Sequence, residues 1–281
     1  MPVITTKKEL EQHLASLPKN QSLGLVPTMG ALHKGHAALV EKAVAENDTV
    51  VVSIFVNPTQ FDNKEDLEKY PNTLEQDVVL LEGISKNIIV FAPTADDIYN
   101  NRIQSKVYDF EGLDKVMEGA FRDDHFNGVG TIVEYLLLLI KPDKAYFGEK
   151  DFQQLQIVKN LIVANNISVT VIGCPIVRET SGLAMSSRNE RLSKDMRKEA
   201  AFIYKTLLTA KEKFGTESAN YVRDWTEKQF ENHSDLKLEY FEITDVDTLT
   251  PVKTKKTALK YRAFIAVYTE GVRLIDNIAL N

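Results

Sequence analysis

The chain has 281 residues, of which 43% are hydrophobic and 26% charged, a composition that allows one large folded domain or two smaller ones. Its 34 basic and 40 acidic residues give a formal net charge of −6, and the basic residues are dispersed along the sequence. We therefore expect a small molecule as the partner, and neither a nucleic acid nor an anionic membrane.

The cysteine usage and the first residues indicate a cytoplasmic protein. The single cysteine, Cys174, cannot form an internal disulfide, and its apolar surroundings favour a buried structural thiol. The N-terminal residues are polar and charged where a signal peptide would need an apolar run, and they are typical of an amphipathic helix. The longest apolar stretch, residues 132–140, is too short to span a bilayer.

Strands and helices are expected to alternate over the first 177 residues. Apolar or β-branched runs predict strands at 22–29, 49–58, 87–94, 144–148 and 168–177. Helical periodicity is found between them, at 33–47, 64–85 with a break at Pro71, 128–142 and 151–166. Nearly continuous apolar strands separated by helices are typical of a parallel sheet that is covered on both faces, with right-handed crossovers. The predicted fold class is therefore α/β, a Rossmann-like, doubly wound parallel sheet.

The pattern changes after about residue 178. Helical segments at 192–215 and 217–232 precede two stretches of alternating hydrophobicity, 236–245 and 261–280, which predict antiparallel strands. We expect a catalytic domain of residues 1–178 followed by a smaller α+β domain of residues 179–281, which would act as a lid on the nucleotide.

The segment PTMGALHKGH, residues 27–36, leaves the first of these sheet strands at its carboxyl end, where open parallel sheets bind ligands. Gly30 and Gly35 would let the backbone approach a bulky anion. His33 and His36 would share one face of the helix that begins near Lys34, whose free N–H groups would point at the same anion. The pattern suits a triphosphate. Taken by itself the segment could also be unrelated polar surface or a zinc site, although a third zinc ligand is not evident.

Polar loops follow other predicted strands of the same sheet. They are NPTQF (57–61), FGEKDFQQL (147–155) and RETSGLAMSSRNERLS (178–193). Each has an ordinary structural explanation: Asn57 begins a turn, Lys150 is a surface charge, and Ser186 and Ser187 cap a helix. Their occurrence together at one sheet edge favours a ligand site.

Six motifs, in this order and spacing, resemble the pantothenate synthetase family, the pantoate–β-alanine ligases of the HIGH-type nucleotidyltransferase superfamily. They are PTMGALHKGH, SIFVNPTQF, YPNTLEQD, FRDDHFNGV, YFGEKDFQQL and MSSRN, and they extend from about Thr28 to Leu192. HxGH alone would indicate only the superfamily. The resemblance implies that ATP and pantoate react to pantoyl adenylate and pyrophosphate, and that β-alanine then displaces AMP to give pantothenate. It also implies a requirement for Mg²⁺ with ATP as substrate, and a homodimer.

The chemistry of such a reaction indicates what the side chains must do. A carboxylate nucleophile is already ionised at neutral pH, since carboxylic acids titrate near pH 4, so its attack on the α-phosphorus needs no general base. The step needs alignment and donors for the charge that develops on the phosphates. The residues expected to supply them are His33, His36, Lys150, Ser186, Ser187 and Arg188.

The resemblance implies further contacts. The ATP site would comprise Met29, Gly30, His33, Gly35, His36, Gly148, Lys150, Asp151, Val177, Met185, Ser186, Ser187 and Arg188, with Asp151 a candidate for the ribose hydroxyls. The pantoate site would comprise Gln60, Gln154, Asn57, Arg122 and His125. Neutral amides suit a substrate with hydroxyls and a carboxylate that must stay nucleophilic. Asp77 matches the family's magnesium-associated acid, with most other ligands coming from the phosphates.

The chain departs from the family's usual pattern at two places. Asn72 stands where an arginine is usual, and Asp123 and Asp124 replace a Pro-Gly pair. These two carboxylates could attract the ammonium group of β-alanine or could simply be exposed.

Two other functions stay open at this point. Another HxGH nucleotidyltransferase would transfer AMP to a phosphate ester, but it should lack the amide pair Gln60 and Gln154. An ATP-sensing module without catalysis would not need Lys150 together with the Ser-Ser-Arg group.

Overall fold

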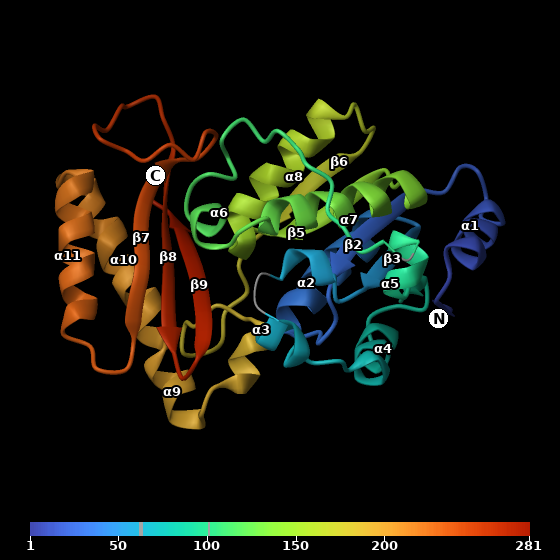
Figure 1. The fold of residues 1–281 in the computed structure, drawn as a ribbon, viewed down its shortest axis with the longest axis horizontal. Coiled ribbons are helices and arrows are strands. Elements are labelled where there is room, and N and C mark those ends of the chain that lie inside the picture. Colours follow the sequence, from blue (N-terminus) through green and yellow to red (C-terminus); the bar gives the residue numbers. More distant parts are fainter. Residues whose placement is uncertain (62–63, 101) are drawn as a thin grey trace. The chain divides into compact units, whose positions relative to one another are not determined.

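The computed structural model describes residues 1–61, 64–100 and 102–281, which divide into two compact units. The first unit comprises Met1–Glu149 and Gln154–Pro175, and the second comprises Lys150–Gln153 and Ile176–Asn281. The first contains a six-stranded sheet and the second a three-stranded sheet (Figure 1).

The sheet of the first unit is parallel throughout, which confirms the predicted α/β fold class. Its strands are β1 (Val3–Ile4), β2 (Leu23–Thr28), β3 (Thr49–Ile54), β4 (Ile88–Phe91), β5 (Lys144–Gly148) and β6 (Thr170–Cys174). They lie in the order β1-β4-β3-β2-β5-β6. The strand order therefore reverses between β2 and β5, the switch point at which such sheets bind ligands beyond the carboxyl ends of the strands.

Helices connect these strands largely where periodicity predicts them. They are α1 (Lys7–Ala15), α2 (Lys34–Glu46), α3 (Lys64–Glu68), α4 (Leu74–Glu82), α5 (Ala95–Tyr99), α6 (Glu118–Phe121), α7 (His125–Ile140) and α8 (Phe152–Ala164). The expected break at Pro71 separates α3 from α4. The strand β1 and the short helices α5 and α6 are elements that the sequence patterns did not predict.

The core of the first unit explains the apolar strand sequences. All of Thr49–Ser53 in β3 is buried, because helices cover both faces of the central strands. Val26, Val52, Val90 and Tyr146 form one hydrophobic cluster that also includes Cys174. Cys174 is 4% exposed, which confirms the expected burial of this cysteine, and burial raises the pKa of its thiol.

The second unit is a small α+β arrangement, as predicted. Its elements are α9 (Lys194–Glu199), α10 (Ala201–Thr216), α11 (Ala219–Glu231), β7 (Lys237–Asp245), β8 (Tyr261–Thr269) and β9 (Val272–Ala279). The strands pair antiparallel in the order β7-β8-β9, and α10 and α11 pack against them (Figure 1). Ile203 and Leu207 of α10 pack with Ile265 and Val267 of β8 in its core.

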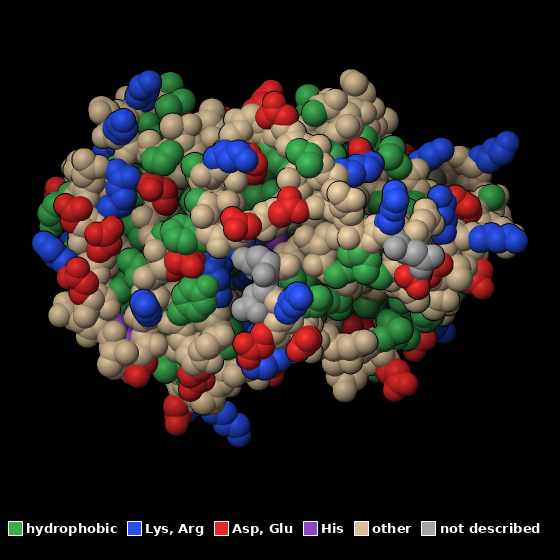
Figure 2. Space-filling model, in the orientation of Figure 1, with side chains coloured by type: hydrophobic (Ala, Val, Ile, Leu, Met, Phe, Trp, Pro, Cys, Tyr) green, Lys and Arg blue, Asp and Glu red, His purple; other side chains and the backbone are tan. Residues whose placement is uncertain are grey.

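The surface agrees with the dispersed charges of the sequence. Figure 2 shows acidic and basic side chains interspersed over the visible face. Within residues 1–61, 64–100 and 102–281, no helix combines the length and the apolar character that crossing a membrane requires.

Candidate active site

The segment between β2 and α2 fixes two histidines by backbone hydrogen bonds. His33 is the N-cap of α2, and its Nδ1 accepts from the amide of Gly35 over 3.1 Å. Nδ1 of His36 accepts in turn from the amide of His33 over 3.3 Å. A neutral imidazole that accepts at Nδ1 carries its proton on Nε2. Both histidines are thereby set as Nε2–H donors beyond the carboxyl end of β2.

Asp77 of α4 holds the loop that leads to these histidines. Its carboxylate is 2% exposed and accepts from the amides of Ala31, over 2.9 Å, and Leu32, over 2.8 Å. The hydroxyl of Thr73 donates to the same carboxylate over 3.2 Å. Gly30 has a φ of +82°, and a Cβ there would lie 3.1 Å from Asp77 Oδ2. The positive φ therefore favours glycine at this point, and the space beside Asp77 is tight.

Most of the hydrogen-bonding capacity of this carboxylate is already used within the protein. A carboxylate offers about four lone-pair sites, and Ala31, Leu32 and Thr73 already use three of those of Asp77. In the part of the chain that the structure describes, no three His, Cys, Asp or Glu side chains are grouped to hold a metal ion. Asp77 could therefore give at most one further ligand, so most ligands of a magnesium ion would come from the phosphates of ATP.

A cavity of about 330 Å³ lies at the carboxyl edge of the sheet in the first unit. Segments that follow β2, β3 and β4 line it together with the start of α4. The lining includes Met29, Gly30, Phe55, Asn72 and Asp77. Asn72 therefore borders the same cavity as Met29 and Gly30, two of the predicted nucleotide contacts.

Gln60 is held at its side chain by a buried hydrogen-bond network. Asn57 is 1% exposed and donates from Nδ2 to Gln60 Oε1, over 3.2 Å, and to the carbonyl of Gly128, over 3.1 Å. The hydroxyl of Tyr99 donates to Oδ1 of Asn57. Nε2 of Gln60 lies 2.7 Å from the sulfur of Met29. The side-chain amide of Gln60 is thus fixed at both its oxygen and its nitrogen.

Arg122 and His125 both contact the backbone carbonyl of Gln60. Nδ1 of His125 lies 2.8 Å from the carbonyl oxygen of Gln60, and its Nε2 lies 3.0 Å from Nη1 of Arg122. Arg122 also donates from Nη2 to this carbonyl over 3.3 Å. Since a carbonyl only accepts and a guanidinium only donates, one neutral tautomer of His125, with the proton on Nδ1, satisfies both contacts.

Four of the five predicted pantoate contacts are therefore brought together, namely Gln60, Asn57, Arg122 and His125. Gln154 lies half-buried on α8 and takes no part in these hydrogen bonds. Asp124, next to His125, adopts a φ of +56°, a conformation that glycine adopts more readily than other residues. Its carboxylate accepts from Asn127 over 2.8 Å, and both Asp123 and Asp124 are exposed.

The Ser-Ser-Arg motif lies in the second unit and follows a short turn. The amide of Met185 donates to the carbonyl of Val177 over 3.0 Å and closes that turn. Ser186 then caps the 3-10 helix η3 (Ser187–Arg191) by accepting from the amide of Arg188 over 3.3 Å. Ser187 is buried and Arg188 is half-buried. Capping thus explains part of what Ser186 does in the fold.

The predicted nucleotide contacts are divided between the two units. Lys150 lies on the 3-10 helix η2 (Glu149–Asp151), with Nζ 3.7 Å from Oδ1 of Asp151. The first unit contributes Met29, Gly30, His33, Gly35, His36 and Gly148, and the second contributes Lys150, Asp151, Val177, Met185, Ser186, Ser187 and Arg188.

The sequence patterns missed the residues that support these segments. Tyr99 reaches Asn57 from a helix that was not predicted, and no local signal identifies it. The sequence does carry a signal for the buried Asp276 of β9. Val272, Leu274 and Asp276 occupy alternate positions of this strand, and all three are buried. An acid at a core position of an alternating strand indicates a paired, buried carboxylate.

Comparisons with known proteins cover the whole chain. A family model described as pantoate-beta-alanine ligase matches residues 2–279. The chain is 58% identical over 282 residues to a pantothenate synthetase of Christiangramia forsetii, covering 100% of both chains. It is 46% identical over 279 residues to a pantothenate synthetase of Bacteroides thetaiotaomicron, covering 99% of this chain and 98% of the other.

Two solved structures match over the same extent. A pantothenate synthetase from Thermus thermophilus has a TM-score of 0.92 at 40% identity, covering 100% of this chain and 99% of the other. A pantoate-beta-alanine ligase from Francisella tularensis, complexed with beta-gamma ATP and beta-alanine, has a TM-score of 0.80 at 36% identity. That match covers 100% of this chain and 98% of the other.

Proposed function

The chain belongs to the pantoate–β-alanine ligase family, and we propose that it joins its two substrates through a pantoyl adenylate. A carboxylate oxygen of pantoate attacks the α-phosphorus of ATP, the bond to the bridging oxygen breaks, and pyrophosphate leaves. The amine of β-alanine then attacks the acyl carbon, and AMP leaves. An amide bond forms as the nitrogen loses a proton, so the products are pantothenate, AMP and pyrophosphate.

One observation supports the adenylation step above all others: backbone hydrogen bonds set His33 and His36 as Nε2–H donors. Donors that are fixed before the reaction stabilise the charge developing on the phosphates without any reorganisation. His33 and His36 therefore act as electrophilic donors and not as bases. Lys150, Ser186, Ser187 and Arg188 are proposed to donate to the phosphates as well.

The remaining nucleotide contacts follow from the family motifs. We assign to the binding of ATP the residues Met29, Gly30, Gly35, Gly148, Val177 and Met185, and we assign Asp151 to the ribose hydroxyls. The amides at the start of α2 suit an anion, because a helix N-terminus carries unsatisfied N–H groups.

Gln60 and Gln154 are proposed to bind pantoate through their neutral amides. The hydrogen bonds around Gln60 give Asn57, Arg122 and His125 a further part in this site. Asn57 acts through the side chain of Gln60, and Arg122 and His125 act through its backbone. The amide of Gln60 would thus meet the substrate in one fixed orientation.

Magnesium is proposed to enter on the triphosphate as MgATP, with Asp77 supporting the loop of Ala31 and Leu32. A homodimer, a cytoplasmic location and a lid formed by residues 179–281 are also proposed. The family resemblance supports the homodimer, and the lone buried Cys174 supports a reducing compartment. A lid would protect the acyl adenylate from water.

The alternatives are not favoured, because the relatives and solved structures named above, which match over nearly the full chain, are pantothenate synthetases and a pantoate-beta-alanine ligase. The decisive experiment measures the exchange of labelled pyrophosphate into ATP with pantoate and magnesium present and β-alanine absent. Exchange should depend on pantoate, and β-alanine should then release AMP and pantothenate. A transferase of phosphate esters would exchange only with its own substrate, and a sensor would show no exchange. Absence of both pantoate-dependent exchange and pantothenate formation would overturn the proposal.

A further inference from the structure

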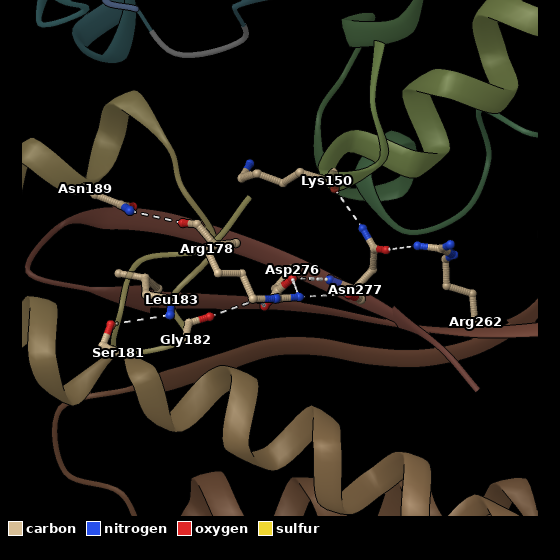
Figure 3. Close-up of polar contacts among 10 residues, drawn as sticks. Lys150, Arg178, Ser181, Gly182, Leu183, Asn189, Arg262, Asp276 and Asn277 are labelled. Atoms are coloured by element: carbon tan, nitrogen blue, oxygen red, sulfur yellow. Dashed lines mark hydrogen bonds and ion pairs between the residues drawn. The ribbon is translucent and has the colours of Figure 1, made fainter. Parts of the chain in front are cut away.

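The C-terminal strand β9 holds Lys150 through its backbone. Asn277 of β9 donates from Nδ2 to the carbonyl oxygen of Lys150 over 2.8 Å. Arg262 of β8 donates to Oδ1 of the same amide, and Asn277 is 1% exposed. Figure 3 shows the side chain of Lys150 extending away from this contact. The amide therefore fixes the backbone of Lys150 and leaves the lysine side chain directed elsewhere.

Asp276, the adjacent residue of β9, holds the turn that leads to the Ser-Ser-Arg motif. Its carboxylate is 4% exposed and accepts from both terminal nitrogens of Arg178, over 2.6 and 3.0 Å (Figure 3). Arg178 also donates to the carbonyl of Gly182 over 3.1 Å, and its Cζ lies 3.6 Å from the centroid of the Tyr204 ring. Gly182 has a φ of +98°, and a Cβ there would lie 2.7 Å from Tyr204. The bidentate ion pair thus fixes the turn of residues 178–184.

Neither supported segment has much regular structure of its own. Lys150 lies in a three-residue 3-10 helix, and the turn is closed by the isolated bridge between Arg178 and Ala184. β9, by contrast, is paired with β8 along its whole length. Successive side chains of a strand point to opposite faces, so two neighbouring residues can hold two different segments. The geometry of both segments therefore depends on one rigid strand.

We propose that Asp276 and Asn277 are positioning residues for adenylation. This inference rests on the proposed function, in which Lys150 and the Ser-Ser-Arg motif contact the phosphates of ATP. Asn277 fixes the position of the Lys150 backbone, and Asp276 fixes the position of the Ser-Ser-Arg motif through Arg178. A misplacement of about 1 Å in such a group costs about 10²-fold in rate.

Asn277→Asp tests the contact to Lys150. It keeps the oxygen that accepts from Arg262 and replaces the donor with a second oxygen, which would face the carbonyl of Lys150. We expect pantoate-dependent pyrophosphate exchange to slow by about 10²-fold. The KM for β-alanine in the complete reaction should not change. A purely structural role would lower thermal stability and leave the exchange rate of the folded protein as it was.

A double-mutant cycle separates positioning from general damage. In a Lys150→Ala background, Asn277→Asp should slow exchange by no more than about twofold, because the group that it positions is gone. Asp276→Asn alone should slow exchange by about 10²-fold, and its effect should be smaller in a Ser186→Ala background, because part of the motif that it positions is gone. If Asp276→Asn does not fold, Arg178→Lys replaces it, since lysine keeps the charge and loses the bidentate geometry.

Arg273→Gln is the matched control, because Arg273 lies on β9 with Asp276 and Asn277 and the substitution breaks its ion pair with Glu239 of β7. It should leave exchange unchanged. The inference is wrong if the effects of Asn277→Asp and Lys150→Ala multiply in the double variant. If Lys150→Ala alone leaves exchange unchanged, the proposed function of Lys150 fails first, and the inference built on it fails with it.

Discussion

The rings of His33 and His36 lie tilted by 35° with their centroids 4.1 Å apart, and each accepts a backbone N–H at Nδ1. The two contacts form a reciprocal capping box at the start of α2, in which the histidines take the parts usually taken by serine and glutamate. In the proposed function each histidine therefore has two tasks, because Nδ1 accepts the backbone amide and Nε2–H donates to the phosphates.

The two tasks of His36 can be separated by substitution. An asparagine oxygen can accept the amide of His33 in place of Nδ1, but asparagine is too short to reach the position of Nε2. We expect His36→Asn to keep its thermal stability and to slow pyrophosphate exchange by about 10²–10³-fold, the effect of removing one donor. His36→Ala should slow exchange as much and also lose about 1 kcal/mol of stability with the cap. Near wild-type exchange in His36→Asn would remove Nε2 from the mechanism, and His13→Ala of α1 is the control.

Gln60 should act on pantoate far more than on ATP. A neutral amide pairs with hydroxyls and carboxylate oxygens, so Gln60→Ala and Gln154→Ala should bind ATP normally and bind pantoate weakly. Asn57→Ala should show the same pattern, because it releases the amide of Gln60 from its fixed orientation. Calorimetric titration with each ligand measures both affinities. A loss of ATP affinity with pantoate affinity intact would reverse the assignment.

The sequence predicts elements and motifs well where the signal is local. The apolar run of β3 identifies a buried strand, and HxGH places His33 and His36 beyond a strand end. The strand β1 is not predicted, because Val3 and Ile4 form a strand only by pairing with β4. The residues that support the site are not predicted for the same reason, since their partners lie far away in the sequence. Asn57 and its hydrogen-bond partner Tyr99 are 42 positions apart.

Glu46 should contribute to acid stability through its contacts at the end of α2. The hydrogen bond from Lys42, and to a smaller extent the one from Tyr146, lowers the pKa of Glu46 from 4.5 to about 2. A carboxylate with a lowered folded-state pKa stabilises the fold above pH 4.5, and this stabilisation is lost as the pH falls toward about 2. Urea unfolding across this window should therefore show a steeper decline for the wild type than for Glu46→Gln. Equal declines would contradict the assignment, and Glu41→Gln, at an exposed position of the same helix, is the control for removing one charge.

Asp77→Asn should distinguish support of the loop from binding of magnesium. The carboxylate accepts two backbone amides, whereas an asparagine offers one oxygen and turns an N–H₂ group toward the other amide. Leaving a buried donor unpaired costs about 1–3 kcal/mol, so the loop before His33 should shift or loosen. We expect exchange to slow by about 10²-fold, as for a small misplacement of reacting groups. The magnesium concentration that gives half-maximal exchange at fixed ATP should stay unchanged.

The matched control for this variant is Asp48→Asn. Asp48 likewise accepts from a backbone amide and a hydroxyl, both of Ser22, over 2.8 and 2.7 Å, and it belongs to no predicted site. It should lose stability with no effect on exchange or on the magnesium dependence. If Asp77 instead ligates the metal, Asp77→Asn should raise the half-saturating magnesium concentration by about 10-fold or more, the scale on which lost metal-site contacts act. That result would assign Asp77 to the magnesium site.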